Sequence, residues 1–159
     1  MRGEHCIMSY WLKNVRLETG YIKENGIVTG TQSEIKHLVI EDGKISRILD
    51  SNEPTPSDVE VKDAMGLLLL PSFVEKHVHL DKTYMGEKWK ACIPAPGVLE
   101  RCEIEKNILA SIPSNTKSRA QRLLDVLLSA GSTHVRTHVD IYPEVQLQNL
   151  VGVNQALET

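Results

Sequence analysis

Regular alternation of apolar and polar residues marks most of the first 70 positions of this 159-residue chain. Alternating runs predict strands, and they lie at 10–18, 35–41, 44–49 and 59–64, followed by an apolar run at 67–70. The dipeptide Asp42–Gly43 predicts a tight hairpin, because both residue types accept positive φ angles. Residues 19–33 contain three glycines and are expected to form a long hairpin loop. We therefore expect residues 1–70 to form the N-terminal part of a small antiparallel β-sandwich, with His37 on its surface or edge.

After Pro71 the periodicity alternates between strand and helix. Helical spacing of apolar residues predicts a helix at 98–112, after a loop at 84–97. A second helix is expected to be capped by Ser114 or Asn115 and to end at Gly131. A strand at 133–140 follows, and Pro143 is expected to open a last helix that ends near Leu157.

The order strand, helix, strand, helix is how a parallel β/α barrel begins. A complete (β/α)8 barrel takes roughly 250 residues, and about 90 follow the start of the first barrel strand here. The expected fold class is therefore α/β, with residues 71–159 as the truncated start of a TIM-type barrel. The chain is expected to be a fragment or the product of a truncated reading frame.

Candidate chemistry lies in the strand that follows Pro71. Side chains alternate along a strand, so His77, His79 and Asp81 fall on one face, with the two imidazoles two residues apart. Two neutral imidazoles at this spacing can hold one divalent cation. The alternative for so short a pattern is a pair of histidines that only form hydrogen bonds at a polar strand end.

The segments Phe73–Lys82 and Val135–Asp140, placed after a Gly-Lys-Ile hairpin, resemble the amidohydrolase superfamily and within it the cytosine deaminase-like branch. Ser72 departs from the family pattern, which usually has Gly after the proline. The resemblance implies a metal-dependent hydrolase in which His77 and His79 bind a divalent metal ion, zinc or iron. It also implies that the remaining ligands and the catalytic residues come from later strands. No catalytic residue is assigned in this chain, which is expected to hold metal weakly and to be inactive alone.

Other polar residues near the strand ends have two possible roles. His138 and Asp140 either border the substrate pocket or form hydrogen bonds behind it. Asp81 either faces substrate or fixes the tautomer of an imidazole, and the second role is preferred. Lys82 is expected to be a solvated cation. Strand phase also suggests a buried ion pair between Glu75 and Arg136 that fixes strand register.

The composition of the chain mainly argues against certain classes of protein and partner. A net charge of −3 gives no indication of nucleic acid or an anionic membrane as partner. No apolar run approaches a membrane span, and the N-terminal residues lack the apolar core of a signal peptide. Three unpaired cysteines, Cys6, Cys92 and Cys102, suit a reducing cytoplasm. The expected partners are a small-molecule substrate and, through an exposed strand edge, further copies of the chain.

Three functions remain open. The preferred one is hydrolysis of C–N bonds other than peptide bonds, by a deaminase-like reaction on a nitrogen heterocycle or related amide. The second is a noncatalytic remnant that serves for binding or assembly. The third is a dihydroorotase- or imidase-like hydrolase, disfavoured by Leu-Asp-Lys after the two histidines and by the Thr-His-Val-Asp strand.

Overall fold

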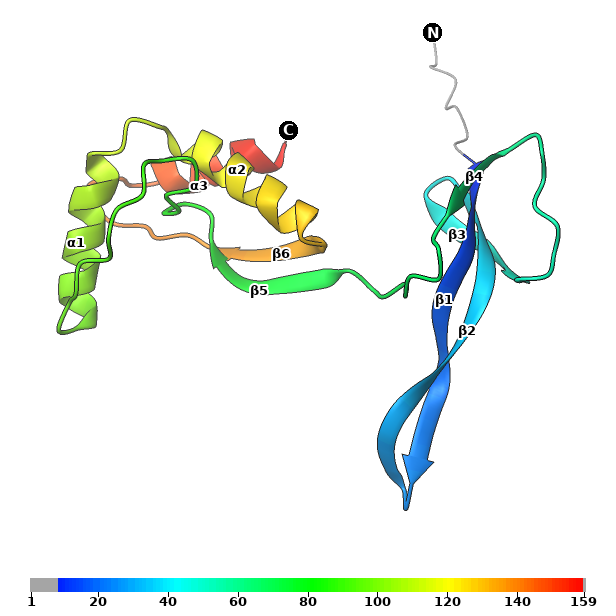
Figure 1. Ribbon diagram of the computed structural model, residues 1–159. Coiled ribbons are helices and arrows are strands. Elements are labelled where there is room, and N and C mark those ends of the chain that lie inside the picture. Colours follow the sequence, from blue (N-terminus) through cyan, green and yellow to red (C-terminus); the bar gives the residue numbers. More distant parts are fainter. Residues whose placement is uncertain (1–8, 159) are drawn as a thin grey trace, which may run out of the picture. The chain divides into compact units, whose positions relative to one another are not determined.

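The computed structural model describes residues 9–158, which form two units that divide between Pro71 and Ser72 (Figure 1). The first unit is built of strands, and the second combines strands with helices. Each unit has a small hydrophobic core of its own. The fold is therefore mixed α/β, as the sequence predicts.

One four-stranded sheet makes up the first unit. Its strands are β1 (Ser9–Glu24), β2 (Ile27–Glu41), β3 (Lys44–Asp50) and β4 (Glu60–Asp63), in the order β3-β2-β1-β4. Neighbours pair antiparallel except β4, which runs parallel to β1. The sequence predicted part of a β-sandwich, and the described residues of this unit form a single sheet, in which the apolar run at 67–70 makes only an isolated bridge to β1 and stays exposed. Within residues 9–71 no second sheet stacks on this one.

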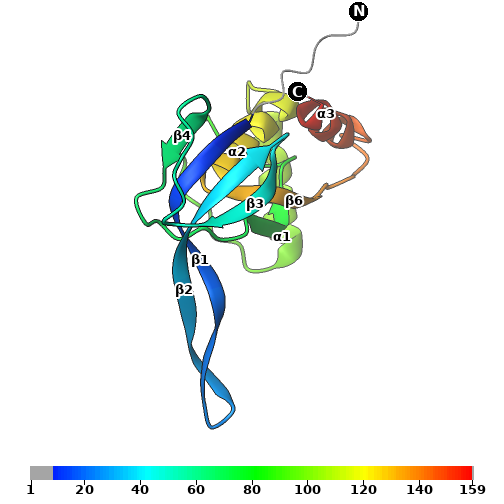
Figure 2. The same cartoon turned by 90° about the vertical axis from the view of Figure 1, so that its right-hand side faces the viewer.

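A long two-stranded ribbon replaces the predicted loop at 19–33. β1 and β2 continue through this region and turn at Asn25 and Gly26, whose φ angles are 50° and 83° (Figures 1 and 2). The predicted turn at Asp42 and Gly43 is confirmed, with φ angles of 52° and 72°. Both turns combine a residue that tolerates positive φ with a glycine, the pattern of two-residue hairpins.

His37 is buried and not a surface residue, contrary to the prediction. It lies on β2, its exposed fraction is 4%, and its Nδ1 accepts a hydrogen bond from the backbone N–H of Asn14 at 3.1 Å. Asn14 has a φ of 57° where the pairing of β1 and β2 shifts register. The imidazole thus satisfies an N–H that the irregular ladder leaves unpaired.

The second unit begins with the two strands that carry the candidate site. β5 (Phe73–His79) and β6 (Ser132–His138) pair parallel, and the helices are α1 (Val98–Ala110), α2 (Thr116–Ser129) and α3 (Gln148–Leu157). The core combines residues from the end of β5, α2 and α3, namely Leu80, Ala120, Val153 and Ala156. The described residues of this unit, 72–158, contain no closed barrel, only this two-stranded parallel sheet with its helices.

Local signals set both ends of α2. The side chain of Asn115 caps α2 by accepting a hydrogen bond from the N–H of Ser118 at 2.9 Å, and Gly131 follows the helix with a φ of 91°. Pro143 does not open the last helix. Turns occupy 143–147, and Gln146 has a left-handed φ of 48° that no α-helix can contain, so α3 begins at Gln148. In the described part of the chain no helix has the length and apolarity to cross a membrane.

Candidate metal centre

The carboxyl ends of β5 and β6 bring three histidines together. His77 and His79 lie on β5 with their ring centroids 5.8 Å apart. His138 ends β6, where it is the register partner of His79, and its ring centroid lies 5.7 Å from that of His79. Because the strands are parallel, their ends meet at one edge of the sheet, and all three imidazoles gather there.

His138 stacks on His77. The ring centroids are 4.1 Å apart and the rings are inclined by 30°. Desolvation lowers the pKa of His138 below its usual value, and the neighbouring His77, Arg136 and His79 lower it further. The environment therefore favours neutral imidazole at His138, the form that keeps a lone pair for a metal ion or a hydrogen bond.

Asp81 is fully buried directly behind these rings. Its Oδ1 lies 3.2 Å from Nδ1 of His79, and its Oδ2 accepts a hydrogen bond from the backbone N–H of Asp140 at 2.8 Å. A buried carboxylate accepts hydrogen bonds, so we assign the proton of neutral His79 to Nδ1. The lone pair then lies on Nε2, the atom left to bind a metal ion.

Two groups of side chains could bind a metal ion here. His79, Asp81 and Asp140 offer ligand atoms that all lie within 4.8 Å of one another. Both oxygens of Asp81 already accept hydrogen bonds, and the ammonium of Lys82 lies 3.0 Å from Oδ2 of Asp140. The imidazoles of His77 and His79 carry no such competing cation, and neutral imidazoles suit zinc and iron. The described residues thus bring three ligand atoms together at His79, Asp81 and Asp140, while the paired imidazoles of His77 and His79 offer the nitrogen donors that suit zinc or iron.

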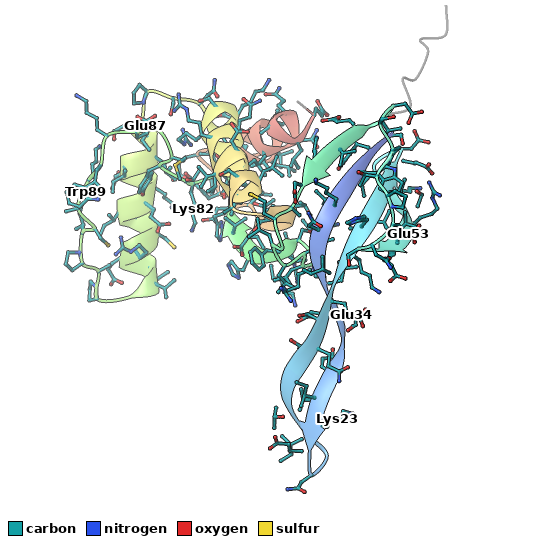
Figure 3. The ribbon with its side chains drawn as sticks, turned by 45° about the vertical axis from the view of Figure 1, so that its right-hand side comes forward. Lys23, Glu34, Glu53, Lys82, Glu87 and Trp89 are labelled. Atoms are coloured by element: carbon teal, nitrogen blue, oxygen red, sulfur yellow. The ribbon has the colours of Figure 1, made fainter. Side chains whose placement is uncertain are left out.

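Lys82 is not the solvated cation that the sequence suggests. Its side chain is 24% exposed, and its ammonium bridges Asp140 at 3.0 Å and Glu105 of α1 at 3.1 Å. Partial burial alone lowers the pKa of Lys82, but hydrogen bonds to Asp140 and Glu105 outweigh it and the pKa is raised. Figure 3 shows Lys82 beside α1, a helix that has no buried residue of its own. This ion pair therefore ties α1 to the strand ends.

Arg119 on α2 is a second residue that sequence reasoning missed. It is buried, and its guanidinium donates hydrogen bonds to the backbone carbonyls of Asp81 at 3.2 Å and Thr83 at 2.9 Å, and also to that of Ser114. Desolvation lowers its pKa, although Glu87 and Asp81 act in the opposite direction. Arg119 lies in the first turn of α2, where a positive charge interacts unfavourably with the helix dipole. This unfavourable position is the feature of the sequence that could have singled out Arg119. Here Arg119 fixes the backbone that follows His79.

The predicted ion pair of Glu75 and Arg136 is not formed beside this cluster. Glu75 and Arg136 form no ion pair: Glu75 is opposite Val135 in the register, its carboxylate accepts from the N–H of His77 at 3.0 Å, and Arg136 is exposed. The predicted pair requires His138 to lie opposite His77, but His138 is the register partner of His79, so Arg136 is not the partner of Glu75. His134 lies near the start of β6, with Nδ1 3.0 Å from Oγ1 of Thr133.

The thiols lie apart from the histidine cluster as far as the structure describes them. Cys92 is exposed and receives a hydrogen bond from the guanidinium of Arg101 at 3.3 Å, and Cys102 is partly exposed on α1. Cys6 lies outside the described residues. Neither described cysteine joins a group of metal-ligating side chains.

Comparison with known proteins gives relatives that are longer than this chain. No family model matches. The chain is 34% identical over 150 residues to YahJ of Escherichia coli K12, an uncharacterized protein, and this match covers 93% of the chain and 33% of YahJ. It is 40% identical over 62 residues to a dihydroorotase of Listeria monocytogenes, which covers 38% of the chain and 14% of that enzyme. The chain thus spans a third or less of the curated relatives that it matches here.

The fold also matches a solved enzyme. The crystal structure of N-isopropylammelide isopropylaminohydrolase from Burkholderia multivorans aligns with a TM-score of 0.71 and 26% sequence identity. The alignment covers 95% of this chain and 34% of that enzyme. Nearly the whole chain therefore resembles about a third of a larger hydrolase.

Proposed function

We infer that this chain, which is similar in sequence and fold to the N-terminal portion of amidohydrolase-superfamily chains, contributes part of a metal centre for hydrolysis of C–N bonds other than peptide bonds. The proposed reaction is deaminase-like and acts on a nitrogen heterocycle or related amide. The Burkholderia enzyme is named for removing an amine from N-isopropylammelide, which supports a deaminase-like reaction.

The observation that carries the proposal is the pairing of His77 and His79 at the end of β5. Their rings lie side by side, and Asp81 holds Nδ1 of His79 so that Nε2 is left for a metal ion. We propose that these two histidines are metal ligands and that Asp81 fixes the tautomer. A divalent zinc or iron ion there would lower the pKa of water and favour attack on a planar carbon.

The chain's own residues do the positioning in this proposal. Asp81 orients His79, and Arg119 holds the backbone at Asp81 and Thr83 through its hydrogen bonds. Asp140 is 41% exposed, and together with His138 it is the proposed border of the substrate pocket. Catalytic zinc sites usually use three protein ligands plus water. We therefore propose that the chain alone binds metal weakly and catalyses no turnover.

A second candidate is a dihydroorotase-like reaction that opens a cyclic amide. The 40% identity to the Listeria dihydroorotase over 62 residues favours it. A protein that contains this chain together with further barrel strands would separate the two reactions. Release of ammonia or an amine from an amine-bearing heterocycle would support the deaminase-like proposal, whereas hydrolysis of dihydroorotate without amine release would favour the second.

The metal proposal is tested by zinc titration of the 159-residue chain. We expect weak zinc binding, and we expect it to be lost in His77→Ala and in His79→Ala. His134→Ala is the matched control, because His134 lies on the neighbouring strand with its ring against Thr133. Tight stoichiometric zinc binding that neither His77→Ala nor His79→Ala changes would refute the proposed ligands and would favour a noncatalytic role for the chain.

A further inference from the structure

An oxygen-rich group lies on the opposite side of His79 from Nε2. Nδ1 of His79 is 3.2 Å from Oδ1 of Asp81 and 3.6 Å from Oδ1 of Asp140. Carboxylate oxygens gathered in this way are attractive to hard divalent cations such as magnesium, calcium and manganese. Asp140 is 41% exposed, so an ion from solvent can reach it. A cation bound there would compete with the hydrogen bond that fixes the His79 tautomer.

Lys82 already supplies a positive charge to this group. Its ammonium lies 3.0 Å from Oδ2 of Asp140, and Glu105 holds it from the other side at 3.1 Å. The side chains of Lys82 and Glu105 are each 24% exposed, so the ammonium is held between two carboxylates in partial shelter from solvent. A second cation at Asp140 would meet a like charge only a few ångströms away.

We propose that Lys82 is a positioning residue whose ammonium keeps divalent cations off the carboxylates beside His79, so that a metal ion is received by the imidazoles. This proposal rests on the proposed function only in that it takes the imidazoles of His77 and His79 as the place where the metal ion binds. The exclusion itself is a property of Lys82 and Asp140.

Manganese binding tests the exclusion directly, because Mn²⁺ prefers carboxylate oxygens. In calorimetric titration Lys82→Gln should bind Mn²⁺ at least about tenfold more tightly than the unmodified chain, since a like charge has been removed. The gain should vanish in Lys82→Gln/Asp140→Asn. Lys82→Arg should behave like the unmodified chain. Glu105→Gln removes the tie to α1 but keeps the ammonium, so it should also show no gain.

Two outcomes would overturn the proposal. One is a folded Lys82→Gln variant that binds Mn²⁺ no more tightly than the unmodified chain, and the other is a gain that persists without the Asp140 carboxylate. A second variant covers the case in which Lys82→Gln does not fold: Lys82→Met also removes the charge, so it should show the same gain in Mn²⁺ affinity, and no gain in it would refute the exclusion. Failure of the proposed ligands would appear separately, as zinc binding unaffected by His77→Ala.

Discussion

Replacing Asp81 with asparagine tests how the buried carboxylate controls His79. The carboxylate accepts from two donors, the backbone N–H of Asp140 at 2.8 Å and Nδ1 of His79 at 3.2 Å. An asparagine offers one oxygen and one amide nitrogen at the same places. The backbone N–H can only donate, so it keeps the oxygen, and the new amide NH₂ then faces Nδ1 of His79.

That arrangement is satisfied only if the His79 proton moves from Nδ1 to Nε2. Nε2 then has no lone pair for a metal ion. Losing a hydrogen-bond partner of a metal-ligating histidine typically weakens metal affinity by about 10–100-fold, which corresponds to about 1.4–2.8 kcal/mol. The chain should stay folded in Asp81→Asn, because every polar atom at this position retains a partner.

Two measurements check the prediction. Long-range ¹H–¹⁵N spectra of the imidazoles should show protonated Nδ1 in the unmodified chain and protonated Nε2 in Asp81→Asn, and zinc titration should show the weaker affinity. Asp140→Asn is the matched control, since its Oδ1 lies 3.6 Å from Nδ1 and its backbone N–H remains. An unchanged tautomer in Asp81→Asn, or an equal change in Asp140→Asn, would refute the reasoning.

Three further predictions concern stability and association. Asn115→Ala removes the side-chain cap of α2 and should lower the free energy of unfolding by about 1 kcal/mol in urea titration, whereas an unchanged value would contradict the cap. Gly131→Ala places a Cβ at a φ of 91° and should cost about 1–2 kcal/mol by the same assay, and a neutral result would argue against that backbone. Among residues 9–158 only β5 pairs with β6, so the free edge of β6 should drive concentration-dependent association in sedimentation, and a monodisperse monomer would contradict this.

Local signals predicted the parts of the fold that depend on neighbouring residues. Asp42–Gly43 and the cap at Asn115 follow from backbone chemistry within a few positions, and alternation places His77 and His79 on one strand. The turn at Asn25 and Gly26 carries the same signal, but nearby glycines made the surrounding ribbon resemble a loop. The predicted turn and the missed turn therefore depend on the same kind of local signal.

Contacts between distant segments were not predictable in the same way. Lys82 meets Glu105 and Asp140 only because α1 and β6 come to the end of β5, and nothing in the local pattern sets those distances. The Glu75–Arg136 prediction failed for a related reason: strand phase assigns a face, but the register, which pairs His138 with His79 and Glu75 with Val135, decides which residues lie opposite.

The two ends of the β5–β6 sheet are held by different kinds of bond. At its start the N–H of Phe73 donates to the carbonyl of Gly131 at 2.9 Å, and the hydroxyls of Ser72 and Thr133 lie 2.5 Å apart. At its other end charged groups contribute, because the ammonium of Lys82 bridges the carboxylates of Glu105 and Asp140. Salt screens partly exposed charges but leaves neutral hydrogen bonds largely intact. Rising ionic strength should therefore weaken the contacts of Lys82 at the histidine end, while the neutral hydrogen bonds of Phe73 and Ser72 at the opposite end stay largely intact.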